Sequence, residues 1–443
     1  MNRLTSHDDR TGVAEQAGTT RAQSAVKGAF FSEFVDMFDV FLPVAVLSPV
    51  LLYFQPASRT YSPLTSLVFV TTLLGRPIGA LLFGAIADRI GRRKASIYSS
   101  AGFSVFTMLI ALLPGYESIG MASYWLLVFL RFVDGIFLGG GYTGAIPLAL
   151  ESTRKDRRGF IGGLIMVGFP AAYLSTNLLA VLMFALFPLN GLHSPYAQWG
   201  WRFPFVLGAL LAAVLTLFYV FKVEESTVWR DEIAGKSNKL PLSDLLTGKS
   251  ARSLAQVFLL MTGLWMTQNI ITLFLPVGLL MRILKLDHVQ ISATLVFTYT
   301  VMLLSYVGAG ALSQKIGRKT FFVMVGVLIL TAGAGMLYVL ACVDHLPLVM
   351  IVALVCALAI LVTSPWGVVV TYINERFVTD VRATGFGVGF SLSVIVPSFY
   401  AFYLSWLGTV MSARLAPVVL LLIGGVIVTL GALIGPETCH VDF

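Results

Sequence analysis

Charged residues and cysteines are both scarce in this sequence of 443 residues. Only 12% of the residues are charged, about half the share of a soluble domain, while 57% are hydrophobic. One water-soluble core cannot enclose that much apolar surface, so lipid must be the solvent for much of the chain. The three cysteines, Cys342, Cys356 and Cys439, have no CxxC spacing and no histidine cluster nearby. Neither a disulfide framework nor a metal site is predicted.

Enzyme motifs are also missing. Segment 139–144 matches G-x-G-x-x-G, but it lies inside an apolar run with no preceding strand, which favours close helix packing over dinucleotide binding. Residues 248–250 read Gly-Lys-Ser but lack the upstream glycine of a phosphate loop, because position 243 is Ser243. No plausible catalytic triad is present. We therefore expect no enzymatic activity, no catalytic residues and no cofactor.

The net charge of +8 suggests a nucleic-acid partner at first sight. The basic residues, however, lie in short connectors between apolar runs, which is typical of the cytoplasmic loops of a membrane protein. We therefore expect the protein to lie in a lipid bilayer and not to bind nucleic acid. Residues 1–26 are polar and lack a cleavable apolar core, so they are predicted to be a disordered cytoplasmic tail.

Twelve runs are long and apolar enough to cross a bilayer, which takes about 20 residues. They are 28–54, 63–87, 95–113, 124–150, 161–188, 200–222, 254–281, 290–313, 320–343, 347–373, 384–407 and 413–435. Clusters of Lys and Arg follow the even-numbered spans, whereas the alternate loops carry only Arg59, Arg282, Lys285 and Arg414. The expected fold class is an all-α integral membrane protein, multi-pass in the cell (inner) membrane, with both termini cytoplasmic.

An internal repeat divides the chain into two halves. Segment 84–93, GAIADRIGRR, recurs as GALSQKIGRK at 310–319, and Glu and Arg bound both 151–158 and 375–382. Two parallel six-helix halves with a solute site at their interface are a known transporter plan. The predicted parts are a tail at 1–26, bundles at 27–222 and 254–435, a cytoplasmic connector at 223–253 and a cytoplasmic tail at 436–443.

Segment 84–94 resembles the G-x-x-x-D-R-x-G-R-R signature of the major facilitator superfamily. Segments 76–79 (RPIG), 199–205 (WGWRFPF) and 436–438 (PET) resemble the branch of metabolite:proton symporters, which neighbours the sugar porters. The resemblance implies two pseudo-symmetric bundles of six helices and alternating access. Helix one departs from the branch by reading DMFD at 36–39 instead of Glu-Trp-Phe-Asp. Helix four departs at Asp134 and at 139–141, so the substrate is expected to be unusual for the branch.

Ionisable residues within spans cost roughly 2.5–3.5 kcal/mol each, so each is a functional candidate. At 1.5 Å per residue, Asp39 lies roughly 16 Å from the cytoplasmic entry of its span, and Arg131 lies roughly 10 Å from the outer entry of its own. The two side chains can therefore approach one another. The resemblance implies that they are the proton-coupling pair, and the alternative is a static buried ion pair.

The predicted substrate contacts come from both halves. The set is Asp36, Arg76, Asp134, Tyr142, Gln268, Asn269, Tyr299 and Trp366. Asp36 and Asp134 suit a cationic or zwitterionic substrate, or simply balance the arginines. Glu33 lies nearer the cytoplasmic surface and is expected to be a solvated or gate residue. The sequence Pro-Trp-Gly at 365–367 predicts a weak point in its helix, where a gate can bend.

The paired basic loops are expected to form a cytoplasmic gate. Asp88 can cap the N-terminus of a neighbouring helix and Arg92 can reach Glu151, and the resemblance implies that this network closes the cytoplasmic side. The alternative is that the loops only fix topology. Gln314 replaces the acid in the second copy, so the contacts of the second basic loop are expected to be weaker. The full predicted gate is Gly84, Asp88, Arg89, Gly91, Arg92, Glu151, Gly317, Arg318, Glu375 and Arg382.

The function expected from these features is proton-coupled uptake of a small polar metabolite, an organic acid or a zwitterion, by a monomer. An efflux antiporter driven by protons is the alternative within transport. A membrane sensor that does not transport would need a signalling domain, for which the connector at 223–253 is too short. A membrane enzyme is disfavoured by the lack of a metal or nucleophile constellation.

Overall fold

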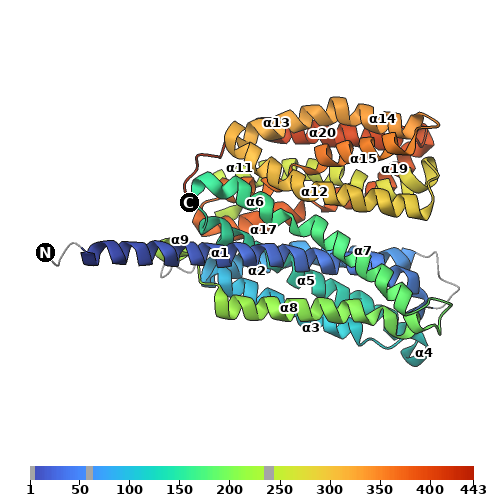
Figure 1. The fold of residues 1–443 in the computed structure, drawn as a ribbon, viewed down its shortest axis with the longest axis horizontal. Coiled ribbons are helices and arrows are strands. Elements are labelled where there is room, and N and C mark those ends of the chain that lie inside the picture. The colour runs from blue at the N-terminus through green and yellow to red at the C-terminus, as the bar shows by residue number, and fades with distance from the viewer. Residues whose placement is uncertain (1–4, 56–62, 234–243) are drawn as a thin grey trace.

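The computed structural model describes residues 5–55, 63–233 and 244–443, and within these ranges the chain forms helices and loops with no strand. Arg59, predicted in an outer loop, and residues 234–243 of the predicted connector lie outside the described residues. Two helical bundles lie side by side, one built by the blue to green part of the chain and the other by the yellow to red part (Figure 1).

In the described residues, the first bundle consists of α-helices (α) and short 3-10 or π-helical segments (η). They are α1 (Thr5–Leu42), η1 (Pro43–Leu47), η2 (Ser48–Tyr53), α2 (Pro63–Ile90), α3 (Arg92–Ala111), α4 (Tyr116–Ile119), α5 (Met121–Glu151), η4 (Lys155–Arg157), α6 (Arg158–Met166), α7 (Gly168–Leu186), η5 (Tyr196–Gly200) and α8 (Arg202–Lys222). The short helix α9 (Thr227–Ile233) follows in the connector.

The second bundle repeats this plan with more interruptions. It comprises α11 (Gly248–Asn269), η6 (Ile270–Ile283), α12 (His288–Ile316), α13 (Arg318–Leu328), η7 (Ile329–Gly333), α14 (Ala334–Cys342), α15 (Leu348–Thr363), α16 (Trp366–Arg376), η8 (Thr379–Val381), α17 (Arg382–Leu392), α18 (Ile395–Ser398), α19 (Tyr400–Val410) and α20 (Ala416–Ile434). The weak point predicted at 365–367 is present, because α15 ends at Thr363 and α16 begins at Trp366.

Eleven helices of the described part of the chain are long and apolar enough to cross a membrane. The predicted span that is absent from these eleven is the third, 95–113, which corresponds to α3. Helix α3 is less apolar because basic residues open it and several serines follow. Its serine hydroxyls donate to backbone carbonyls, including Ser99 to Phe137 O at 2.6 Å and Ser104 to Ala209 O at 2.8 Å. Since α3 packs between α5 and α8, these polar groups are satisfied inside the bundle.

The start of the chain differs from the prediction. Helix α1 begins at Thr5, so residues 5–26, expected to be a disordered tail, form the first part of a continuous helix. This segment contains four Ala, two Gln, two Arg and one Glu, which favour helix and allow the first span to extend. Arg21 and Glu224 form an exposed ion pair at 2.8 Å between α1 and the residues that follow α8.

The two bundles meet along α2 and α17, along α6 with α12 and α16, and along α7 and α12. Glycines allow close backbone approach at this interface. A Cβ atom on Gly159 or on Gly310 would collide with the carbonyl oxygen of the other residue, and one on Gly84 would meet the Cα atom of Thr384 at 2.7 Å. Small residues therefore bring the halves into direct contact, as in other helix crossings in membranes.

Candidate functional site

The first cluster of buried charges joins α1 and α5. Arg131 Nη1 donates to Asp39 Oδ2 at 2.8 Å and to Asp134 Oδ2 at 3.1 Å, and all three side chains are at most 1% exposed. Thr107 of α3 lies 3.1 Å from Asp39 Oδ1 and 3.3 Å from Asp134 Oδ1. The predicted approach of Asp39 and Arg131 is present. Asp134, predicted as a substrate contact, shares the same arginine.

The second cluster lies one turn away along α1 and reaches the other half. Arg76 donates to Asp36 in a buried ion pair, and its guanidinium lies 5.2 Å from the centre of the Tyr142 ring. The Tyr142 hydroxyl forms a hydrogen bond with the hydroxyl of Ser391 on α17. Glu33, expected to be solvated, is only 2% exposed and packs against Gly168. The expectation of a solvated Glu33 was wrong, because its side chain faces the bundle interior.

The candidates from the second half divide into two groups. Trp366 lies in an aromatic cluster with Trp265, at 4.5 Å between ring centroids, and Gln268 is buried with an unpartnered Oε1. Asn269 instead donates to Pro397 O at 2.9 Å, and Tyr299 stacks on Tyr173 of the first half at 3.7 Å. The contacts of these two side chains are therefore a backbone carbonyl for Asn269 and a tyrosine ring for Tyr299, and neither belongs to the charged clusters.

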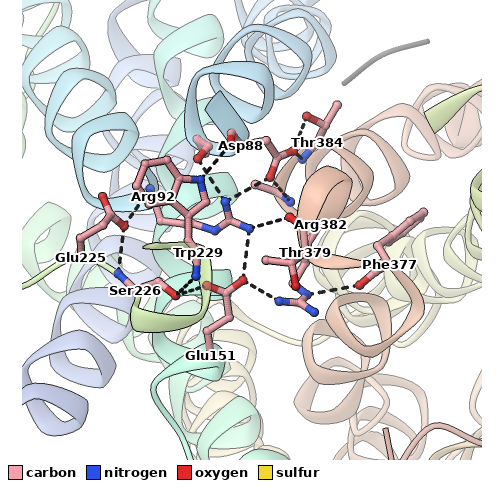
Figure 2. A network of polar contacts seen from close by, with 12 residues as sticks. Asp88, Arg92, Glu151, Glu225, Ser226, Trp229, Phe377, Thr379, Arg382 and Thr384 are labelled. Carbon is pink, nitrogen blue, oxygen red and sulfur yellow. Dashed lines mark hydrogen bonds and ion pairs between the residues drawn. The ribbon is translucent and has the colours of Figure 1, made fainter. Parts of the chain in front are cut away.

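A third polar network joins the first half to the second (Figure 2). The Asp88 carboxylate, at the end of α2, accepts hydrogen bonds from the N–H groups of Ala383 at 3.1 Å and Thr384 at 2.9 Å. It also accepts one from the Thr384 hydroxyl at 2.7 Å. Asp88 therefore caps the first turn of α17, as predicted, and the helix that it caps belongs to the other half.

Glu151 is the second centre of this network. Its carboxylate accepts hydrogen bonds from Arg92 at 3.2 Å, from Arg382 of the other half at 2.7 Å and from the Ser226 hydroxyl. Arg92 also donates to Thr379 O of the other half at 2.9 Å. We call the set Asp88, Arg92, Glu151, Arg382 and Thr384 the latch network. Arg89, also predicted in the gate, has an exposed side chain, in contrast to the buried Arg92.

The second copy of the motif makes fewer contacts across the interface. Gln314 Oε1 accepts one N–H of the first half, from Gly159 at 3.0 Å, and also a hydrogen bond from Arg318. Arg318 forms a buried ion pair with Glu375 at 3.4 Å. Since Asp88 accepts three hydrogen bonds from α17 where Gln314 accepts one from α6, the asymmetry has the direction expected from replacing the acid.

Sequence reasoning missed the role of two carboxylates that follow the bundles. Glu225 Oε1 accepts from the N–H of Arg92 at 3.0 Å, and Glu437 Oε1 accepts from the N–H of Arg318 at 2.8 Å. Each caps the helix that starts after a glycine with positive φ, Gly91 or Gly317. Burial acts to raise the pKa of Glu437, but hydrogen bonds from backbone N–H groups outweigh it and lower that pKa. The signal in the sequence was that each half is followed by an acid, Glu225 within 224–226 and Glu437 within 436–438.

Gly91→Ala is expected to lower the thermal unfolding midpoint of the purified protein more than Gly120→Ala does. Both glycines have positive φ, 116° and 61°, so alanine adds strain of about 1–2 kcal/mol at either position. A Cβ at Gly91 would also collide with the Glu225 carboxylate, whereas no atom lies within 4 Å of one at Gly120. Differential scanning fluorimetry measures both shifts, and equal shifts would refute a steric role for Glu225.

The chain belongs to the major facilitator superfamily, because the family model described as Major Facilitator Superfamily matches residues 29–436. Inner membrane metabolite transport protein YhjE of Escherichia coli (strain K12) is 29% identical over 397 residues, which cover 85% of each chain. Alpha-ketoglutarate permease of the same strain is 29% identical over 391 residues, 85% of this chain and 84% of that protein.

Among solved structures, that of the proton:xylose symporter XylE bound to 6-bromo-6-deoxy-D-glucose has a TM-score of 0.76 to this chain at 16% sequence identity. It covers 95% of this chain and 97% of the symporter, and this similarity shows the fold. The predicted family and fold class are thus confirmed. The chain is a multi-pass membrane transporter of this superfamily.

Proposed function

We propose that the protein is a secondary active transporter that takes up a small polar metabolite together with protons, by alternating access. The observation that carries this proposal is the buried group in which Asp39 and Asp134 share Arg131 between α1 and α5. A carboxylate held by an arginine in a dry interior changes its proton affinity when that arginine moves, so Asp39 is the proton carrier and Arg131 responds to its charge.

The similarity to known transporters supports the same function. An alpha-ketoglutarate permease and a metabolite transport protein are relatives over most of the chain, and a proton symporter shares the fold. We infer an organic acid or a zwitterion as the substrate, held by Arg76 and Asp36 where the two halves meet. We also propose that it lies in the inner membrane, and that both termini are cytoplasmic because Lys and Arg cluster after the even-numbered spans.

The latch network then closes the cytoplasmic side. Asp88 and Glu151 of the first half hold α17 of the second half, so these contacts must break before the substrate can leave toward the cytoplasm. Because both halves of the network belong to one chain, we propose that a single copy can transport, and that the proton gradient drives it without a cofactor. Opening and closing of this network is the alternating-access step.

Uptake by proteoliposomes of a labelled metabolite panel, with and without an imposed pH gradient, tests this proposal. An inside-alkaline gradient is expected to drive accumulation above the external concentration, and a protonophore is expected to abolish it. Accumulation unaffected by collapse of the gradient would remove proton coupling. Stimulation by an inside-acid gradient would instead indicate the antiporter, for which the same buried acids are suited.

A further inference from the structure

The buried charges of the two clusters around Arg76 and Arg131 do not balance. The carboxylates of Glu33, Asp36, Asp39 and Asp134 and the guanidiniums of Arg76 and Arg131 are each at most 5% exposed. Four potential anions therefore accompany two cations: Arg131 forms ion pairs with Asp39 and Asp134, and Arg76 forms one with Asp36. An uncompensated carboxylate in a dry interior is costly, so each cluster requires a further positive charge or a proton.

The cluster around Arg76 also has hydrogen-bonding atoms that no protein group satisfies. Within the described residues, Glu33 Oε1, Asp36 Oδ1 and Arg76 Nε are buried and have no hydrogen-bond partner. Buried polar atoms are normally paired, so three unpaired ones at the interface between the halves point to a ligand.

A series of contacting aromatic rings leads from this cluster into the second half. The Tyr142 ring, which faces Arg76, lies 5.2 Å from the Phe390 ring, and Phe390 lies 5.8 Å from Trp366. Trp265 contacts both Phe390 and Trp366. Aromatic faces beside carboxylates attract a desolvated cation, above all a bulky ammonium group that carries few or no N–H donors.

We infer that the transported solute is a zwitterion with a cationic nitrogen close to a carboxylate, bound at Glu33, Asp36 and Arg76. This inference rests on the proposed function and narrows its substrate class. The ammonium group lies against the two acids and the aromatic rings, and the solute carboxylate lies against Arg76. A dicarboxylate without a cationic nitrogen would add negative charge to a group that already has an excess of it.

Matched solutes that differ only in the charged nitrogen test the substrate class. Glycine betaine and tert-butylacetate have the same shape, as do proline and cyclopentanecarboxylate, and 2-oxoglutarate represents the dicarboxylates. Initial rates of uptake into proteoliposomes are expected to favour the nitrogen-bearing member of a pair by about tenfold or more. Equal rates within the pairs, or transport of 2-oxoglutarate alone, would overturn the substrate class and leave the transporter proposal standing. Transport of none would overturn both.

Glu33→Gln tests the site itself. The substitution keeps the shape but removes the surplus charge, so the preference for the nitrogen-bearing solute is expected to fall to about twofold or less. Glu117→Gln, at an exposed glutamate that pairs with His193, is the matched control and is expected to keep the full preference. The ratio of dissociation constants of purified protein gives the same comparison without transport. Retained preference in Glu33→Gln, and likewise in Asp36→Asn, would overturn the assignment.

A second, independent observation concerns the residues that follow the last span. Arg158 of α6 donates to Val441 O at 2.8 Å, and its guanidinium lies 3.6 Å from the centre of the Phe443 ring. The guanidinium of Arg382, at the start of α17, lies 4.0 Å from the same ring. One aromatic ring therefore contacts an arginine of each half. Lys155 and Asp442 add an ion pair at 2.8 Å, but Asp442 is 84% exposed and this pair contributes little.

The geometry points to a strap, residues 441–443, that stabilises the closed state of the latch network. Arg382 belongs to that network, and Arg158 occupies the equivalent position in the first half. When the halves separate at this end, the Phe443 ring must leave at least one of the two guanidiniums. The connector shows a parallel arrangement, because Trp229 donates to Asp88 O at 2.9 Å and α9 packs against η8 of the other half.

Phe443→Ala is the test, with Asp442→Asn as the matched control. Spin labels at the exposed positions Lys94 and Thr320, at the starts of α3 and α13, report separation of the halves once the native cysteines are replaced by serine. Phe443→Ala is expected to raise the ratio of separated to closed populations by about fivefold or more, because two cation–π contacts are lost. Asp442→Asn is expected to leave the ratio within about twofold. An unchanged ratio in Phe443→Ala would overturn the strap.

Discussion

Asp39→Asn is expected to abolish gradient-driven accumulation of the transported solute and to leave only its equilibration across the membrane. Asparagine keeps the shape of the aspartate next to Arg131 but carries no titrating proton, so entry of the solute no longer moves a proton. One pH unit is worth about 1.36 kcal/mol per proton, so a transporter coupled to one proton accumulates about tenfold per unit. The accumulation ratio of the variant is expected to be about one, measured in proteoliposomes with an imposed gradient.

Asp134→Asn is the matched control, because it is the same change on the same arginine. Asp134 lies three residues from Arg131 on α5 and moves with it, whereas Asp39 reaches Arg131 from α1. Asp134→Asn is therefore expected to slow transport while preserving the accumulation ratio. Full accumulation by Asp39→Asn would refute its role as proton carrier, and loss of accumulation in Asp134→Asn alone would transfer that role to Asp134.

The contacts that the sequence predicted well are those between charges in apolar runs. A charged side chain in an apolar run requires a partner, and few oppositely charged residues are available there. The pairs Asp39 with Arg131 and Arg92 with Glu151 could therefore be predicted from the positions of the charged residues. The internal repeat added the position of Asp88 at the end of α2. Gly84, Gly91 and Gly317 were predicted to matter because they recur in the repeat. In the structure, Gly84 allows close approach of the two halves, and Gly91 and Gly317 have positive φ.

The contacts that the sequence did not predict depend on how each helix is rotated and on long-range packing. Position along α1 gives the depth of Glu33 but not its direction, so its burial against Gly168 was missed. For Asp134 the sequence left two alternatives open, a substrate contact or balance of an arginine, and in the structure it pairs with Arg131 three residues away on α5. That Asp39 and Asp134 share this arginine depends on the relative rotation of α1 and α5. Phe390 and Phe443 are two of 32 phenylalanines, so their identity gave no signal of a special role.

The two copies of the basic loop differ at one hydrogen-bond acceptor, which is Asp88 in the first copy and Gln314 in the second. Asp88→Asn is expected to lower the rate of uptake by about tenfold to a hundredfold while the amount of protein in the membrane is unchanged. The carboxylate accepts two backbone N–H groups and one hydroxyl at the start of α17 and lies 3.4 Å from Arg92 Nη1. An amide has one acceptor oxygen and turns its NH₂ group toward a donor. Each charge-assisted hydrogen bond lost costs about 1.5–3 kcal/mol, and only the closed state of the latch network bears that cost.

Gln314→Ala in the second copy is the control for Asp88→Asn. It removes one hydrogen bond across the interface, from the N–H of Gly159, so its uptake rate is expected to stay within about threefold of wild type. Initial rates normalised to the protein detected in the membrane separate transport from expression. Near-normal uptake by Asp88→Asn would mean that the basic loop only fixes topology. Equal losses of uptake rate in both variants would mean that the two copies contribute equally to transport, although Gln314 is the weaker acceptor.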